Sequence, residues 1–273
     1  MVGLIALYFH VSRSARTLPE NHTEHFLESG RTPGRQVLVC VGDSITHGRV
    51  SSNYVELLSA MLKHRGIDVV NAGINSELAW NVLQRIERVV ACNPDFVTIL
   101  IGTNDANATL MDENMQRYIR EMNLPRKADL AWYRENIEKI IQTLQTKTHA
   151  RIALISLPPI GEQRDHEAYR RSAEYSRVVL ETAEKTGIAY LPLHETMDRY
   201  LQKHPHRPRV TYEDDPRTVM YKMLFSHFVL GKSFDRIADE NGQHLLIDIL
   251  HLNGRGAAMI ADLAATFVLS SAE

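Results

Sequence analysis

The feature of this sequence that most constrains its fold is a regular alternation of short apolar runs with amphipathic segments. The apolar runs are typical of strands that are buried on both faces of a parallel sheet. We expect strands at residues 36–41, 68–72, 96–101, 151–157 and 188–191. In the intervening segments apolar residues recur at helical spacing, so we expect helices at residues 51–64, 78–92, 129–146, 166–185 and 255–269. Five strands separated by helices predict an α/β fold with a doubly wound parallel sheet and right-handed crossovers.

The domain organisation is predicted from the segments that fall outside this alternation. Residues 1–35 are expected to form an N-terminal arm or linker, because residues 12–35 are polar and rich in turn residues. Residues 36–273 are expected to form one domain, with insertions at about 106–128 and 204–242. The second insertion contains an apolar stretch at residues 219–230, which is either a lid or acyl-binding wall, or a core or dimer-facing helix.

Composition excludes several classes of protein and of partner. Apolar residues make up 44% of the 273 residues, which excludes a disordered chain and predicts a sizeable core. The formal net charge is −2 and no long run of like charge occurs, so a nucleic-acid partner is not expected. Cys40 and Cys92 lie in apolar stretches and are predicted to be buried thiols.

Residues 1–11 are apolar, but they are about half as long as the roughly 20 residues that a membrane span requires. We therefore expect no stable membrane span and interpret the segment as a packed or interfacial N-terminus. A remnant of a truncated export signal or a membrane-surface anchor is the alternative. The segment lacks a basic region and a clear cleavage site, so we expect a cytoplasmic location.

Reacting groups in an open parallel sheet lie in the loops at the carboxyl ends of the strands. Ser44 follows the first expected strand between Gly42 and Gly48, which makes it a candidate nucleophile. The alternatives are a turn that caps a helix or a phosphate-binding loop, although no P-loop motif occurs there.

A serine nucleophile requires a base, and the base requires a group that orients it. Among the 13 histidines, His251 is preceded by an aspartate at three residues' distance, Asp248. That offset allows the carboxylate of Asp248 to reach one ring nitrogen and leaves the other for Ser44. The alternative is a surface turn that caps the last helix.

Acyl transfer also requires hydrogen-bond donors for the oxyanion of the tetrahedral intermediate. Gly73 follows the second expected strand and offers a backbone N–H that a ligand can approach closely. Asn104 follows the third and offers a side-chain amide. In isolation, each residue is equally consistent with an ordinary turn.

The ordered motifs Gly-Asp-Ser, Asn-x-Gly, Gly-x-Asn-Asp and Asp-x-x-His resemble the SGNH hydrolase superfamily, also called the GDSL esterase/lipase family. The resemblance extends over residues 42–251. It implies a flavodoxin-like three-layer α/β/α sandwich and a serine hydrolase that cleaves carboxylic esters through an acyl-enzyme. The implied catalytic residues are Ser44 as nucleophile, His251 as general base and acid, and Asp248 as the residue that orients His251. The implied oxyanion hole consists of the Ser44 and Gly73 amides and the Asn104 side chain.

The same resemblance implies no metal or organic cofactor and a small-molecule or lipid ester as substrate. Two motif positions depart from the common pattern, since Ile45 replaces leucine and Leu252 replaces proline, but neither change alters a catalytic position. An acyltransferase or a sugar O-acetyl esterase with the same triad remains an alternative. A noncatalytic ligand-binding module is an alternative of another class. The sequence does not indicate an oligomeric state.

Two groups of polar residues are given structural rather than chemical roles. His204, His206, Asp214 and Asp215 do not have the spacing of a metal site and are interpreted as a solvated loop. His47 follows Ser44 closely and is interpreted as part of a local turn, with a contact to substrate as the alternative.

Overall fold

The structure, a computed structural model, describes residues 13–270 of the chain and contains a five-stranded parallel sheet in the order β2-β1-β3-β4-β5. The strands are β1 (Gln36–Gly42), β2 (Ile67–Gly73), β3 (Phe96–Leu100), β4 (Arg151–Ile155) and β5 (Ala189–Leu191). Almost every residue of the three central strands is buried, because helices cover both faces of the sheet. The predicted α/β/α sandwich and its five strands are confirmed.

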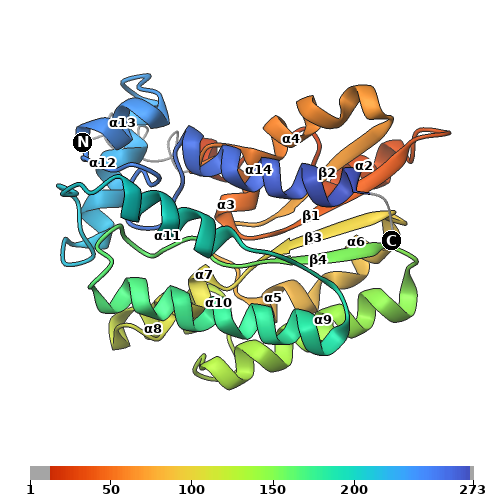
Figure 1. Cartoon of the computed structure of the whole chain (residues 1–273), viewed down its shortest axis with the longest axis horizontal. Coiled ribbons are helices and arrows are strands. Elements are labelled where there is room, and N and C mark those ends of the chain that lie inside the picture. Colours follow the sequence, from red (N-terminus) through yellow and green to blue (C-terminus); the bar gives the residue numbers. More distant parts are fainter. Residues whose placement is uncertain (1–12, 271–273) are drawn as a thin grey trace.

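Helices form one layer on each side of the sheet (Figure 1). One layer contains α4 (Tyr54–Leu62), α11 (Leu193–Lys203) and α14 (Gly254–Leu269). The other contains α5 (Ala79–Gln84), α6 (Ile86–Ala91), α9 (Leu130–Lys147) and α10 (Glu167–Thr186). The remaining short elements are α2 (Thr23–Ser29), α3 (Ser44–His47), the 3₁₀ helix η1 (Lys63–Arg65), α7 (Thr103–Ala108), α8 (Asp112–Glu121), α12 (Pro216–Phe228) and α13 (Phe234–Glu240).

Local sequence explains where the long helices begin and which face they bury. In α9, Ile137, Ile140, Ile141 and Leu144 recur at helical spacing and are fully buried against the sheet layer. The side chain of Asp129 accepts a hydrogen bond from the Trp132 N–H and caps the first turn. Cys40 and Cys92 are buried free thiols, as predicted. Burial raises the pKa of Cys40 to about 12 and that of Cys92 to about 11.

One predicted helix, at residues 78–92, is wrong as a single element. The structure breaks it at Arg85 into α5 and α6, where the backbone of Arg85 leaves the helical region. The guanidinium of Arg85 turns towards the sheet, where it contacts the Glu77 carboxylate and donates a 2.8 Å hydrogen bond to the Ala72 carbonyl. A buried long-range contact therefore overrides the local helical pattern.

Part of the predicted N-terminal arm lies against the edge of the sheet. The Asn71 N–H donates to the Asn21 carbonyl, and the neighbouring His22 forms an isolated parallel bridge with Asn71. This contact and α2 cover the outer edge of β2, which would otherwise present unpaired backbone groups. Residues 1–11, for which we expect a packed or interfacial N-terminus, lie outside the described residues. Within residues 13–270, no helix is both long enough and apolar enough to span a membrane.

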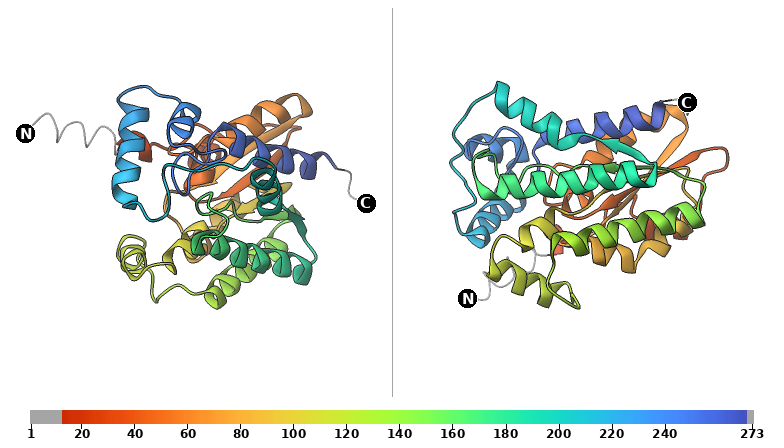
Figure 2. Two further views of the ribbon diagram at one scale, coloured as in Figure 1. Left: turned by 60° about the vertical axis from the view of Figure 1, so that its left-hand side comes forward. Right: turned by 60° about the horizontal axis from the view of Figure 1, so that its bottom comes forward.

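Both predicted insertions form helices at one end of the sheet. Figures 1 and 2 place α8 of the first insertion and α12 and α13 of the second at the end where α3 and α7 lie. Helix α12 buries Val219, Met223 and Leu224, and the last two belong to a cluster that also includes Val50 and Ile247. Its exposed residues include Tyr221 and Phe225. A role of this helix as a lid or acyl-binding wall stays a prediction.

Candidate active site

The candidate site lies at the carboxyl ends of β1, β2 and β3. Gly42 at the end of β1 pairs with Gly73 of β2 on one side and with Leu100 of β3 on the other, so the three following loops start at the same level. The chain crosses from one side of β1 to the other between β2 and β3, and ligands of such folds bind at this switch point. Ser44 is the first residue of α3 and lies directly beyond this edge.

The structure brings together the three predicted catalytic residues. The Ser44 Oγ atom lies 3.1 Å from His251 Nε2, although the two residues are 207 positions apart in the chain. The other ring nitrogen, Nδ1, lies 2.7 Å from Oδ2 of Asp248. All three residues are buried, with Ser44 and His251 each retaining 8% of their surface exposed. Serine, histidine and carboxylate therefore form a continuous hydrogen-bonded chain, which is the arrangement of a nucleophile, its base and an orienting acid.

The loop that carries Asp248 and His251 folds back on itself. Leu246 and Leu252 form an antiparallel bridge, and the Ile247 N–H donates to the His251 carbonyl. Inside the turn, Oδ1 of Asp248 accepts 2.7 Å hydrogen bonds from the N–H groups of Leu250 and His251. One carboxylate oxygen thus holds the turn while the other holds the imidazole ring.

Electrostatics stabilise the charged form of this pair. Burial by itself raises the pKa of the Asp248 carboxyl, but the charge of His251 and the hydrogen bonds from its ring and backbone outweigh burial and lower the pKa. Burial by itself lowers the pKa of His251, but Asp248 and, more weakly, Asp43 outweigh it and raise the pKa above 6.5. The imidazole is therefore a stronger base than a free histidine.

Two of the three predicted oxyanion donors, on Gly73 and Asn104, lie in the loops beside Ser44 and already make hydrogen bonds. The Gly73 N–H donates to Oδ1 of Asn71 at 2.9 Å. The Asn104 side-chain amide donates to the Glu77 carbonyl at 3.0 Å and to Oδ2 of Asp43 at 3.3 Å. No acceptor within residues 13–270 lies at hydrogen-bond distance from the Ser44 N–H, as is usual for the first turn of a helix.

Gly73 permits close packing between the end of β2 and α3. A Cβ atom at this position would lie 2.2 Å from the His47 backbone nitrogen, which is closer than any side chain can approach. His47 itself is buried, and burial followed by the charge of Arg49 lowers its pKa to about 4. The imidazole of His47 is thus neutral near pH 7, and the structural role predicted for it stays a prediction.

Comparison with known proteins decides the family. A model of the family described as GDSL-like Lipase/Acylhydrolase matches residues 40–259, a range that includes all five predicted site residues. The chain belongs to this family. The resemblance to SGNH hydrolases is thereby confirmed, and the protein is a carboxylic ester hydrolase of the GDSL type.

Relatives of this GDSL esterase include acetylxylan esterases. An acetylxylan esterase from Geobacillus stearothermophilus is 28% identical over 185 residues, which are 60% of this chain and 79% of the relative. The solved structure of the acetyl xylan esterase AlAXEase has a TM-score of 0.60 at 20% identity and covers 85% of this chain and 100% of its own. The structure of LAE5, an alpha/beta hydrolase from the metagenome of Lake Arreo, Spain, has a TM-score of 0.57 at 22% identity, with 86% and 97% covered.

Axe2, an acetylxylan esterase from Geobacillus stearothermophilus, has a TM-score of 0.60 at 18% identity and covers 86% of this chain and 95% of its own. Three further structures of Axe2 are described as catalytic mutants, and they replace a serine, an aspartate and a histidine with alanine. These structural likenesses show the shared fold.

Two buried carboxylates that support the GDSL motifs were missed by the sequence analysis. Glu162, which follows β4, accepts hydrogen bonds of 2.7–2.8 Å from three consecutive N–H groups at residues 244–246 and so braces the loop before Asp248. The side chain of Glu77 forms an ion pair with Arg85, and its backbone carbonyl accepts the hydrogen bond from the Asn104 amide. Glu162 could have been noticed in the sequence because it follows shortly after the carboxyl end of a strand. The pairing of Glu77 with Arg85 could not, because Arg85 lies within a helical pattern.

The polar residues at 204–215 of the GDSL esterase make local contacts in the structure. Within residues 13–270, no group of three or more His, Cys, Asp or Glu side chains is arranged to hold a metal ion. Asp214 and Asp215 are exposed, as expected for a solvated loop, and they also accept hydrogen bonds from nearby residues, with Asp215 capping α12. His206 departs from that expectation, because its side chain is largely buried and its Nε2 lies 2.5 Å from the Glu162 carboxylate.

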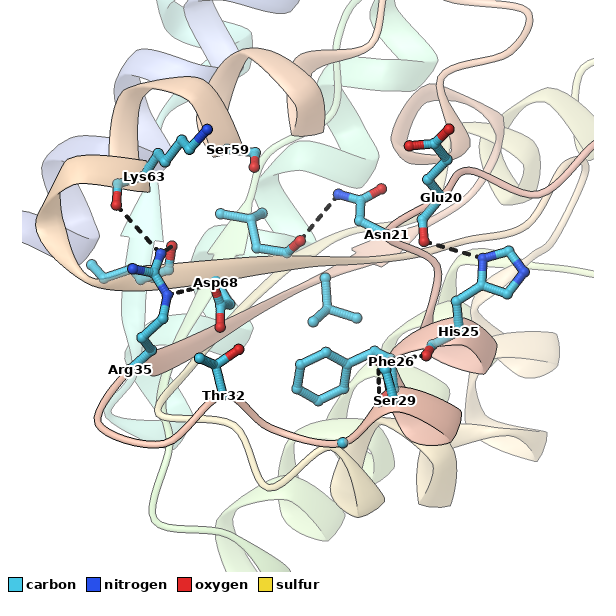
Figure 3. A pocket seen from close by; sticks show the side chains of 14 residues that line it. Glu20, Asn21, His25, Phe26, Ser29, Thr32, Arg35, Ser59, Lys63 and Asp68 are labelled. Carbon is cyan, nitrogen blue, oxygen red and sulfur yellow. Dashed lines mark hydrogen bonds and ion pairs between the residues drawn. The ribbon is translucent and has the colours of Figure 1, made fainter.

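A cleft of about 600 Å³ lies between α2, α4 and the amino-terminal half of β2, away from the loops that hold Ser44 (Figure 3). Its polar side chains are largely engaged within the protein. Arg35 Nε lies 2.6 Å from Oδ1 of Asp68, and Asn21 donates to the Val69 carbonyl at 3.0 Å. These contacts attach the N-terminal arm to the edge strand β2, so the polar side chains of the cleft are accounted for by this attachment.

Proposed function

We propose that Ser44 is the nucleophile of this GDSL esterase, that His251 is its general base and acid, and that Asp248 orients His251. The observation that carries the proposal is the hydrogen-bonded chain in which Ser44 Oγ, His251 and Asp248 are joined at 3.1 and 2.7 Å. In Axe2 the mutated aspartate and histidine are also three positions apart, which is the spacing of Asp248 and His251.

The reaction proceeds in two halves, formation of the acyl-enzyme and its hydrolysis. In the first, Ser44 Oγ attacks the ester carbonyl carbon while His251 Nε2 accepts the hydroxyl proton, and collapse of the tetrahedral intermediate breaks the ester C–O bond. His251 returns the proton to the departing alkoxide, so the alcohol leaves and the acyl group stays on Ser44. In the second half, water attacks the acyl carbon while His251 Nε2 accepts its proton, and collapse of this intermediate breaks the bond between the acyl carbon and Ser44 Oγ. His251 then returns the proton to Ser44 Oγ, and the acid is released.

The oxyanion of each intermediate is assigned to the Ser44 N–H, the Gly73 N–H and the Asn104 side-chain amide. The Ser44 N–H is the donor without a competing acceptor among the described residues. The donors on Gly73 and Asn104 would be shared between the oxyanion and their present acceptors. A donor aimed at developing charge in a water-poor site stabilises the transition state more than the ground state.

We further propose that the substrate is an acetyl ester of a saccharide of the xylan type. The proposal is supported by the acetylxylan esterases among the relatives in sequence and in fold. Release of acetate from acetylated xylan tests it directly, with Ser44→Ala measured in parallel to subtract spontaneous hydrolysis.

A chain-length series separates an acetyl esterase from a lipase. We expect kcat/KM for p-nitrophenyl acetate to exceed that for p-nitrophenyl octanoate by at least about tenfold, because a pocket shaped for acetyl disfavours each additional methylene. A maximum at octanoyl, without acetate release from acetylated xylan, would contradict the saccharide proposal and favour an acyl-binding role for residues 219–230.

The pH dependence of activity follows from the charge state of His251. The ring accepts the proton of Ser44 only when it is neutral, so kcat/KM is expected to fall as pH decreases through the pKa of His251. Because that pKa is raised, the midpoint of the acid limb is expected above 6.5. Asp43→Asn removes a carboxyl whose charge raises this pKa, while the asparagine side chain can still cap the Ile45 N–H. Burial raises the pKa of Asp43 itself to about 7, so its charge acts mainly on the neutral side of the acid limb.

We therefore expect the acid limb of the kcat/KM profile of Asp43→Asn to lie at lower pH than that of wild type. The measurement is kcat/KM for p-nitrophenyl acetate between pH 5 and pH 9. A wild-type midpoint below 6.5, or an acid limb that Asp43→Asn leaves in place, would contradict this account.

A further inference from the structure

A buried hydrogen-bond relay joins Asn104 to both insertions. The Tyr118 hydroxyl donates to Asn104 Oδ1 at 2.7 Å, and the Asn107 side-chain amide donates to the Tyr118 oxygen at 3.2 Å. The Tyr212 hydroxyl donates to Asn107 Oδ1 at 2.6 Å, and Asn114 donates to the Tyr212 oxygen at 2.9 Å. Each of these five side chains is at most 8% exposed. The relay therefore links α7, α8 and the loop before α12.

Every hydrogen bond in the relay runs in one direction. Tyr118 has one hydroxyl proton and accepts from Asn107, so its proton is directed to Asn104. Asn104 passes the direction on, because its amide nitrogen donates towards the Glu77 carbonyl and Asp43. Hydrogen bonds that share a direction polarise one another and become stronger.

The contact with Tyr118 selects which end of the Asn104 carboxamide faces the site. The hydroxyl donor lies against Oδ1, and an amide turned by 180° would present its NH₂ group to that donor. Burial raises the pKa of Tyr118, which keeps the hydroxyl protonated as a donor near neutral pH. The guanidinium carbon of Arg117 lies 4.4 Å from the centre of the Tyr118 ring and helps to hold it in place.

We propose that Tyr118 is a positioning residue of this esterase, whose hydroxyl holds the Asn104 carboxamide with its N–H groups towards the oxyanion, and that Asn107 and Tyr212 hold Tyr118. The inference rests on the proposed role of Asn104 in ester hydrolysis. It assigns to the two insertions a shared task, which is to fix the orientation of an oxyanion donor.

The test is Tyr118→Phe, which keeps the ring and removes the hydroxyl. We expect kcat for p-nitrophenyl acetate to fall about tenfold with KM changed by less than about threefold, because the lost interaction acts on the transition state. In an Asn104→Ala background the same substitution is expected to cause no further loss of kcat, since the group that it positions is absent.

The matched control is Tyr169→Phe. The Tyr169 hydroxyl of α10 is also buried and donates to a side-chain oxygen, that of Asp198, at 2.6 Å. This variant is expected to retain wild-type kcat. Tyr212→Phe provides a second test if Tyr118→Phe does not fold, and its kcat is expected to fall about threefold in wild type and not at all in Asn104→Ala.

The outcomes separate the inference from the function on which it rests. A wild-type kcat for both Tyr118→Phe and Tyr212→Phe would overturn the positioning role, and so would losses of kcat that multiply with the loss caused by Asn104→Ala. In either case an inactive Ser44→Ala would still support the esterase mechanism. Full activity of Ser44→Ala would overturn the mechanism and the inference together.

Discussion

Replacement of Ser44 with alanine is expected to lower kcat for p-nitrophenyl acetate by about 10⁴–10⁶-fold. The reason is that the substitution removes the atom that becomes acylated, and His251 Nε2 then has no hydroxyl to deprotonate. The variant is also expected to lose labelling by a fluorophosphonate probe, which reacts with an activated serine.

Stability is expected to change little in Ser44→Ala, because the hydroxyl contacts only the His251 ring and its removal leaves the α3 backbone intact. The measurements are steady-state kinetics, probe labelling and a thermal melt. Ser59→Ala on α4 is the matched control and is expected to behave as wild type. Labelling of Ser44→Ala at the wild-type rate would show that another residue is the nucleophile.

Asp248→Asn is expected to lower kcat by about 10³–10⁴-fold without unfolding the loop. The asparagine oxygen can still accept from the N–H groups of Leu250 and His251, so the turn is retained. Its NH₂ group, however, faces His251 Nδ1 and favours the tautomer whose proton lies on Nε2. That proton points at Ser44, so the ring cannot act as the base.

The pKa of His251 is also expected to fall in Asp248→Asn, because the carboxylate that raises it is lost. The residual activity should therefore have its acid limb at lower pH than wild type. Asp235→Asn is the matched control, since Asp235 likewise accepts from a backbone N–H, that of Gly254, but does not contact His251. Equal kcat values for Asp248→Asn and Asp235→Asn would exclude the orienting role of Asp248.

Much of the fold could be predicted because the signals are local. A strand buried on both faces needs an uninterrupted apolar run, and the expected strand at residues 36–41 agrees with β1 at Gln36–Gly42. The face of α9 could be predicted from the spacing of its isoleucines. The division of residues 78–92 into α5 and α6 could not, because it depends on the burial of Arg85 against Glu77 and the end of β2.

The candidate site likewise has features that could be predicted from the sequence and features that could not. The residue types that follow successive strands indicated Ser44, Gly73 and Asn104, and the three-residue offset indicated Asp248 and His251. The resemblance to SGNH hydrolases joined these five residues into one site. The competing hydrogen bonds of Gly73 and Asn104 were not predictable, nor was the contact between Tyr118 and Asn104. Tyr118 lies within the insertion expected at about 106–128, and nothing in the neighbouring sequence marks its hydroxyl as part of the site.

Short-range patterns in the sequence were therefore sufficient to predict the five strands, most of the long helices between them and the residue types that follow the strands, because these depend on neighbours a few residues away. Packing on the sheet was needed to bring Ser44 to His251 across 207 residues, to place Glu162 against the loop before Asp248 and to bring both insertions to Asn104. These contacts join segments whose relative position is set by packing on the sheet, and hydrogen bonds form only when that packing brings donor and acceptor within about 3 Å.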